Sequence, residues 1–194
     1  MKRLAKSAKT TTFEALLGIL SMGPMTGYEI RQRIDLSIGN FWSESFGQIY
    51  PALNKLRLQG LVDVTEAGKK GRKVYSLTLA GRERLHEWLG MMPQPLKPRN
   101  EMLLKLFFGA EGDVEKARAQ VLATRAQYTT DLERYAGLES MLKTNQARNP
   151  GLPYFLMTLN YGFIEARAIV AWADQTLASL DEIAAKPTQQ EEKP

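Results

Sequence analysis

The chain has 194 residues, of which 44% are hydrophobic and 24% charged, with 26 Lys and Arg against 21 Asp and Glu. Length and composition fit one large or two small folded domains, and no apolar run reaches the ~18 residues that a membrane span requires. The chain has no Cys and a single His, His86. This excludes disulfides, zinc fingers, Cys nucleophiles and metal sites built from His clusters. We expect no cofactor, no metal, no membrane partner, no signal peptide and a cytoplasmic location.

The charge is distributed unevenly along the chain. Residues 1–90 carry 14 Lys and Arg against 8 Asp and Glu, whereas residues 91–194 carry 12 against 13. A basic amino-terminal half favours a polyanionic partner, either nucleic acid or an anionic membrane surface. Three prolines within six residues predict a stiff connector in the middle of the chain. The predicted organisation is a first domain at 1–92, a connector at 93–99, a helical domain at 100–185 and a disordered tail at 186–194.

Helical patterns dominate the start of the first domain. Apolar residues recur at helical spacing from Phe13 to Leu20, and Gly23 with Pro24 ends this first helix. A Ser or Thr followed three residues later by Glu or Gln is typical of a helix start, because the two side chains can cap each other's backbone amides. This pattern occurs at Thr11 with Glu14, Thr26 with Glu29, and Ser45 with Gln48.

Residues 45–59 form the third predicted helix of this domain. Its stripe of Ile49, Leu53 and Leu56 would face the core, so that polar and basic side chains are left on the other faces. Pro51 cannot donate a backbone hydrogen bond, and we therefore expect an irregular first turn.

A β-hairpin is predicted next, from two β-rich segments at 62–66 and 73–78 that flank a Gly-bearing loop. Thr78 can cap a fourth helix. This order is that of a winged helix-turn-helix, in which a helix enters the DNA major groove and the hairpin tip neutralises phosphates. The alternative is that the tip is an ordinary solvated loop, but its position after a candidate recognition helix favours DNA contact. The basic residues of the tip are Lys69, Lys70, Arg72 and Lys73.

The same region resembles the PadR family of bacterial transcriptional regulators. The matching strings are TGYEI at 26–30, IYPAL at 49–53 and GRKVYSLT at 71–78, and the resemblance extends over residues 12–89. It implies a Tyr-Pro pair at the DNA-facing start of the recognition helix. Tyr28 is a candidate phosphate contact or, alternatively, a half-buried packing residue. The other candidates for contacts to base edges or phosphates are Ser45, Gln48, Tyr50, Asn54 and Lys55.

The second domain is predicted to contain a short helix at 101–108 and two long helices, at about 113–145 and 154–185. The long helices are too long and too few to form a compact bundle alone, so we expect a second copy of the chain to cover their apolar surface. The architecture resembles the longer PadR subfamily that includes the virulence activator AphA, which implies a homodimer. The candidate dimerisation residues on the last helix are Leu156, Leu159, Phe163, Val170, Leu177 and Leu180.

An effector site is also implied by the resemblance, because PadR relatives bind phenolic or other aromatic molecules that release DNA. Aromatic walls with a nearby cation would suit a phenolic acid. The alternative is that these aromatic residues are core and interface residues. The candidate effector residues are Trp88, Tyr128, Tyr161 and Arg167.

The predicted fold is therefore mainly α-helical, with a winged helix-turn-helix domain followed by a long-helix dimerisation domain. We expect a DNA-binding transcriptional regulator, a repressor released by an aromatic effector, that binds a pseudo-palindromic operator as a dimer. No convergent acid, base and nucleophile appear, so an enzyme is not expected. The alternative function is a winged-helix adaptor that contacts proteins, against which the basic wing argues.

Overall fold

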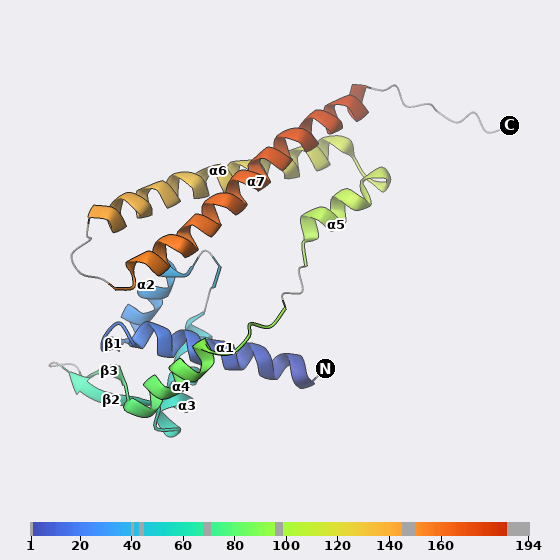
Figure 1. Cartoon of the computed structure of the whole chain (residues 1–194). Helices are drawn as coiled ribbons and strands as arrows, with labels where there is room; N and C mark the ends of the chain where they lie inside the picture. The colour runs from blue at the N-terminus through green and yellow to red at the C-terminus, as the bar shows by residue number, and fades with distance from the viewer. Residues whose placement is uncertain are drawn as a thin grey trace. The chain divides into compact units, whose positions relative to one another are not determined.

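The computed structural model describes residues 2–39, 41–42, 45–67, 71–95, 99–144 and 150–185. The chain forms two compact units, Met1–Pro95 and Leu96–Pro194 (Figure 1). Helices predominate in both, and a small sheet lies in the first. The predicted fold class, a winged helix-turn-helix followed by a long-helix domain, is confirmed. The tail predicted at 186–194 lies outside the described residues.

The first unit is built on four helices that share one apolar core. Fully buried side chains from α1, α2 and α3 meet there, including Leu16, Ile30 and Leu53. Their burial on one side of each helix is the outcome that the helical spacing predicted. The helices are α1 (Lys2–Leu20), α2 (Gly27–Ser37), α3 (Phe46–Leu58) and α4 (Leu79–Leu89).

The predicted helix starts are confirmed for α2 and α3 but wrong for α1. Thr26 and Glu29 form the capping box of α2. Helix α1, however, already begins at Lys2, so Glu14 lies inside the helix and does not cap it. Its carboxylate is buried and accepts a hydrogen bond from Arg84 Nη2 of α4 at 2.7 Å. The spacing of Thr11 and Glu14 therefore predicted a cap that does not form, because Glu14 is used in an ion pair with a distant helix.

The sheet has three strands, one more than the sequence predicted. Strand β3 (Arg72–Leu77) lies between β2 (Val62–Ala67) and β1 (Met25–Thr26), and both pairs are antiparallel. Strand β1 is only two residues long, and too short to show a period-2 pattern. It pairs Met25 with Tyr75 and so attaches the start of α2 to the wing.

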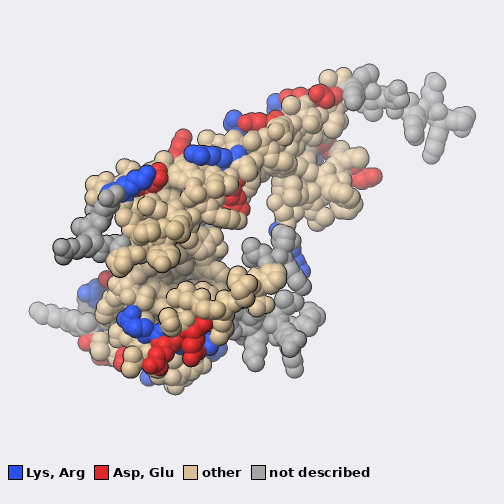
Figure 2. Space-filling view, in the orientation of Figure 1, with Lys and Arg blue, Asp and Glu red and all other residues tan. Residues whose placement is uncertain are grey.

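The second unit is a pair of long helices preceded by short helical segments. Helix α6 (Val114–Thr144) and helix α7 (Leu152–Ala185) run antiparallel (Figure 1). Helix α5 (Glu101–Phe107) and the 3-10 turn η1 (Gly109–Glu111) come before them. In Figure 2, basic and acidic side chains are interspersed along α6 and α7, in keeping with the near-neutral charge of this half.

The apolar seam of α7 packs on α6 of the same chain. Leu159 and Phe163 share a cluster with Tyr135, whereas Leu177 and Leu180 belong to a separate cluster with Val121. This differs from the expectation that the seam faces a partner chain. The reason is that heptad spacing indicates a helical partner but does not state which chain supplies it. The remaining seam residues, Leu156 and Val170, are half-buried.

Candidate nucleic-acid interface

Helix α3 has one buried and one exposed side, as a recognition helix requires. Ile49, Leu53 and Leu56 are completely buried, and Asn54 and Lys55 are exposed. Pro51 lies inside the helix without ending it. The expected irregular first turn is not observed: the Ile49 N–H bonds the Ser45 carbonyl four residues back at 3.0 Å, as in a regular α-helix, and the Gln48 N–H bonds the same carbonyl three residues back. The helix therefore presents polar side chains on a rigid, core-anchored support.

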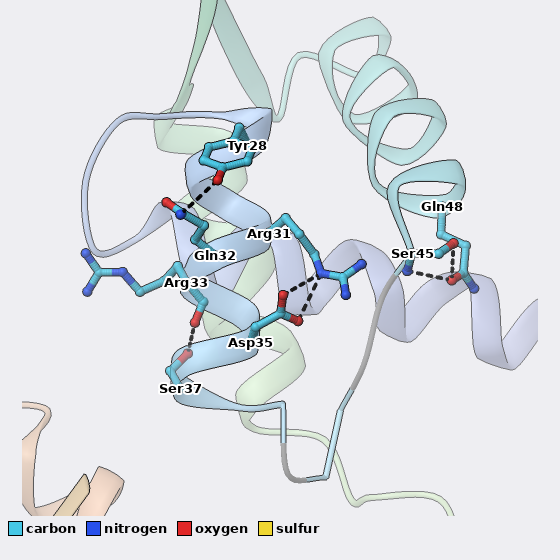
Figure 3. A network of polar contacts seen from close by, with 8 residues as sticks. All are labelled: Tyr28, Arg31, Gln32, Arg33, Asp35, Ser37, Ser45 and Gln48. Carbon is cyan, nitrogen blue, oxygen red and sulfur yellow. Dashed lines mark hydrogen bonds and ion pairs between the residues drawn. The ribbon is translucent and has the colours of Figure 1, made fainter. Parts of the chain in front are cut away.

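The side chain of Gln48 is used in the structure of the helix start. Its Oε1 accepts hydrogen bonds from the Ser45 backbone N–H at 3.0 Å and from the Ser45 hydroxyl at 2.9 Å (Figure 3). Gln48 and Ser45 were both candidate DNA contacts. A glutamine that reads adenine in a bidentate manner needs its oxygen as well as its nitrogen, so that contact would break this cap. With the cap intact, Gln48 can contact DNA only through its amide nitrogen, as a hydrogen-bond donor.

Tyr50 lies on α3 with its ring against the start of α2. A Cβ atom placed on Gly27 would approach the Tyr50 ring to 2.5 Å, so the glycine makes room for the ring. A pocket of about 570 Å³ adjoins this contact and includes Tyr28. The complete lining is Thr26, Gly27, Tyr28, Glu29, Tyr50, Arg72, Lys73 and Tyr75. The pocket brings together α2, α3 and the wing strand β3, three segments that are separate in the sequence.

The basic wing is described only in part. Arg72 and Lys73 are exposed at the start of β3 and border the pocket. Lys73 pairs in register with Glu66 of β2. Lys69 and Lys70 lie outside the described residues. Two of the four predicted wing cations are therefore located beside Tyr28 and Tyr50.

The charges around the pocket favour an anion, although the lining includes an acidic residue as well as two basic ones. Glu29 is the acidic residue of the lining. Hydrogen bonds from the Thr26 backbone N–H and hydroxyl, with a smaller contribution from the positive charge of Arg72, lower the pKa of Glu29. The carboxylate is thus ionised but turned into the α2 cap, with Thr26 N–H 2.7 Å away. Burial raises the pKa of Tyr75, which remains a neutral donor at pH 7.

Helix α2 contributes polar residues that the sequence analysis missed. Gln32 Nε2 donates to the Tyr28 hydroxyl at 3.1 Å, while Arg31 is paired with Asp35 at 2.7 Å (Figure 3). The exposed guanidinium of Arg33 makes no ion pair within the part of the chain that the structure describes. The one available signal was the spacing of four between Tyr28 and Gln32, which places both on the same helix face.

The candidate effector residues have different surroundings. Trp88 packs against the core of the first unit, and Tyr128 packs against a core cluster of the second. Tyr161 is exposed on α7. Arg167 lies with its guanidinium carbon 5.4 Å from the Phe163 ring centre, a cation–π contact. None of the four side chains lines the pockets of about 570, 450 and 300 Å³ that the described residues form.

Metal sites and membrane spans do not occur in the described residues. Within those ranges, no group of three or more acidic or His side chains could hold a metal ion. None of the helices formed by the same residues is long and apolar enough to cross a membrane.

Two family models match the two units of the chain. Residues 16–87 match the transcriptional regulator PadR-like family, and residues 98–181 match the virulence activator alpha C-terminal domain. Among curated proteins, the negative transcriptional regulator PadR of Bacillus subtilis strain 168 is 29% identical over 175 residues. This match covers 86% of the present chain and 96% of the relative.

Solved structures of these relatives align along nearly their whole length. Bacillus subtilis PadR in complex with operator DNA matches with a TM-score of 0.74 and 28% identity, over 86% of this chain and 96% of that one. The same protein with p-coumaric acid gives 0.70 and 26%, over 89% and 97%. The Vibrio cholerae virulence activator AphA gives 0.72 and 30%, over 89% and 99%. The chain therefore belongs to the PadR-like family of transcriptional regulators, in the longer group that carries the virulence activator alpha domain.

Proposed function

We propose that the protein binds double-stranded operator DNA in a sequence-specific manner as a homodimer. The observation that carries the proposal is the exposed polar face of α3 beside a pocket bordered by Arg72 and Lys73. Such a helix fits the major groove, and the wing cations supply phosphate contacts. The similarity to a PadR structure that contains operator DNA supports the proposal. A regulator of this kind acts on the chromosome, in the cytoplasm.

The residues of α3 divide into base-reading and phosphate-binding roles. Asn54 is the main base reader of the proposal because its side chain is exposed, and its only described bond, from Arg57 to its oxygen, is long at 3.3 Å. Lys55 and Tyr50 supply contacts beside it. Gln48 donates through its amide nitrogen alone, and Ser45 holds Gln48 in place.

Selection from a library of random duplexes tests specific readout. The purified protein is expected to enrich a pseudo-palindromic sequence, because the two recognition helices of a dimer read half-sites about one helical turn apart. Asn54→Ala is expected to relax base preference at one position of each half-site. Enrichment of no sequence, together with no binding to any duplex at low salt, would favour the alternative of a protein-binding adaptor.

The wing is tested by its salt dependence. Changing Lys69, Lys70 and Arg72 together to Ala is expected to weaken binding to all sequences alike. The slope of log K against log salt should fall by about 0.9 for each phosphate that the altered wing no longer neutralises. A matched variant with Lys105, Lys116 and Lys143 changed to Ala removes the same charge from the second unit and should keep the slope. Unchanged gel shifts of the wing variant across salt would show that the wing does not contact DNA.

We further propose that the protein is a repressor released by a small aromatic acid. The support is the structure of a relative with p-coumaric acid. The proposed contacts in the second unit are Tyr128 and Arg167; Trp88 of the first unit is a separate candidate, and Tyr161 is exposed on α7. Adding p-coumaric acid is expected to raise the melting temperature and to release the selected duplex, and Arg167→Met should weaken both effects. If neither effect appears with p-coumaric acid or with other phenolic acids, the proposal that an aromatic effector releases the DNA is wrong.

A further inference from the structure

Tyr28 and Gln32 form a hydrogen-bonded pair on the outer face of α2. The Tyr28 side chain is 59% exposed, and Gln32 is exposed as well. Gln32 Nε2 donates to the Tyr28 hydroxyl oxygen at 3.1 Å. In Figure 3 the two side chains lie one turn apart, and the Arg31–Asp35 ion pair is on a different side of the helix.

This bond determines what the tyrosine can offer to a ligand. A phenolic hydroxyl has one proton to donate and can also accept. Because its oxygen already accepts from Gln32, its proton remains available to an acceptor outside the protein. An amide is suited to this task, since its NH₂ end can only donate. A carboxylate at the same position would accept the tyrosine proton and withdraw it from the ligand.

The surroundings indicate that the external acceptor is an anion. Tyr28 borders the pocket that also contains Arg72 and Lys73. The acidic residue of this pocket, Glu29, is engaged by Thr26. The same capping box occupies the Thr26 and Glu29 backbone N–H groups, at 2.7 Å and 3.3 Å. Recognition at this position therefore depends on side chains, with Tyr28 as the neutral donor and the wing cations as the charge.

We propose that Gln32 is a positioning residue, which holds the Tyr28 hydroxyl as a donor to a non-bridging oxygen of one DNA backbone phosphate seated at this pocket. The inference rests on the proposed DNA-binding function and adds a contact from α2 to those of α3 and the wing. Hydrogen bonds from a neutral donor to a charged acceptor are stronger than neutral pairs. Removing this one is expected to weaken binding about tenfold.

The first experiment measures duplex affinity by fluorescence anisotropy with a 40-base-pair duplex of mixed sequence and with the selected duplex. Tyr28→Phe removes the donor, Gln32→Met removes the orienting bond, and Gln32→Glu reverses its direction. On both duplexes, wild type is expected to bind most tightly, Gln32→Met more weakly, and Gln32→Glu most weakly of these three. Circular dichroism and thermal unfolding should match wild type, since both side chains are exposed.

Double variants separate orientation from simple charge repulsion. In the Tyr28→Phe background, Gln32→Met is expected to have no further effect. Gln32→Glu should retain only a penalty that high salt removes, because that part is electrostatic. If both changes at Gln32 cost the same with and without the Tyr28 hydroxyl, the positioning role is wrong.

Single methylphosphonate substitutions in the selected duplex locate the contact. For wild type, neutralising one particular phosphate per half-site should weaken binding. For Tyr28→Phe and for Gln32→Met, neutralising that same phosphate should have no effect, whereas their response to substitution at every other phosphate should match wild type. If the two variants respond to substitution at every phosphate as wild type does, the inference is wrong. The result is distinguishable from failure of the proposed function, in which wild type itself binds neither duplex.

Discussion

Gly81 illustrates how a single backbone position connects the wing to the helix that follows. A Cβ atom at this residue would lie 2.1 Å from the carbonyl oxygen of Leu61. The Gly81 N–H also bonds the Thr78 hydroxyl, which in turn donates to the Gly60 carbonyl. The start of α4 is therefore packed directly on the backbone before β2, without space for a side chain.

The Gly81→Ala variant is expected to lose about 1–3 kcal/mol of unfolding free energy, because backbone must move to relieve the clash. Gly18→Ala is the matched control in the same unit, where an added Cβ meets nothing within 4 Å. That change should be neutral or stabilise the helix by up to about 1 kcal/mol. Urea unfolding of both variants provides the comparison, and equal midpoints would contradict the packing argument.

Glu29 makes stability depend on pH in a defined direction. Its bonds to Thr26 lower its pKa from the ordinary value of 4.5. A carboxylate with a lowered pKa in the folded state contributes stability that is present above the unfolded pKa and lost as pH falls through the folded pKa. Glu29→Gln should therefore be less stable than wild type at neutral pH, and the difference should vanish in acid. A difference that is constant from pH 7 to pH 3 would show that the charge plays no part.

Individual residues also show where sequence reasoning succeeds and where it fails. The core positions of α3 and the caps of α2 and α3 were predictable, because they follow from local spacing. The roles of Glu14 and Gln32 were not. Glu14 meets a partner 70 residues away, and Gln32 acquires its significance from the pocket beside Tyr28.

At the scale of elements, the α6–α7 hairpin is held in register by two ion pairs spaced seven residues apart. Arg118 pairs with Asp181 at 2.7 Å, and Arg125 pairs with Asp174 at 2.5 Å. Arg125 lies between Val121 and Tyr128, two residues of α6 that belong to the apolar clusters, and its pair with Asp174 explains why a cation is tolerated there. Both pairs favour the same register of the antiparallel helices, which apolar contacts alone specify less sharply.

The Arg125→Asp variant is expected to lower the unfolding free energy by about 1 kcal/mol, since partly exposed pairs contribute about 0.2–1 kcal/mol and the change adds repulsion. The double exchange Arg125→Asp with Asp174→Arg should restore most of this stability. Lys143→Glu is the control, because its pair with Glu139 lies within α6. Differential scanning calorimetry tests the rescue, and a double variant no more stable than the single one would contradict the pairing.

Of the whole elements, those with a repeating pattern were predictable. The long helices and the hairpin extend over enough residues for their periods to be recognised. Strand β1 has two residues, so that only its pairing with β3 defines it. The seam of α7 was recognised, but its partner proved to be α6.

At the scale of the whole molecule, the packing of α7 on α6 leaves a second apolar stripe for a partner. Four exposed residues of α7 follow heptad spacing: Tyr154, Met157, Tyr161 and Ile164. Large apolar side chains that remain exposed in this spacing are typical of a helix with an interface still to form. We propose this stripe, in place of the buried seam, as the surface that the second copy of the chain covers.

The wild-type chain is expected to have the mass of a dimer by light scattering at micromolar concentration. Ile164→Asp combined with Met157→Asp should yield monomers that remain helical, because both side chains are exposed in the single chain. Gln127→Asp, at an exposed position of α6, is the control and should remain dimeric. A wild-type mass of one chain, or a dimer unaffected by the double change, would contradict the proposal.

The sequence by itself determined the two-part organisation, the class of fold, the candidate recognition helix and the family, because composition, periodicity and spaced motifs are local properties of the chain. Only the tertiary structure decided which apolar faces are used within the chain and which remain exposed. It also decided that Gln48 caps its own helix and that Tyr28, Tyr50 and Arg72 border one pocket. The physical reason is that a periodic pattern states that a face must be covered or a polar atom paired, whereas the identity of the partner depends on packing between distant segments.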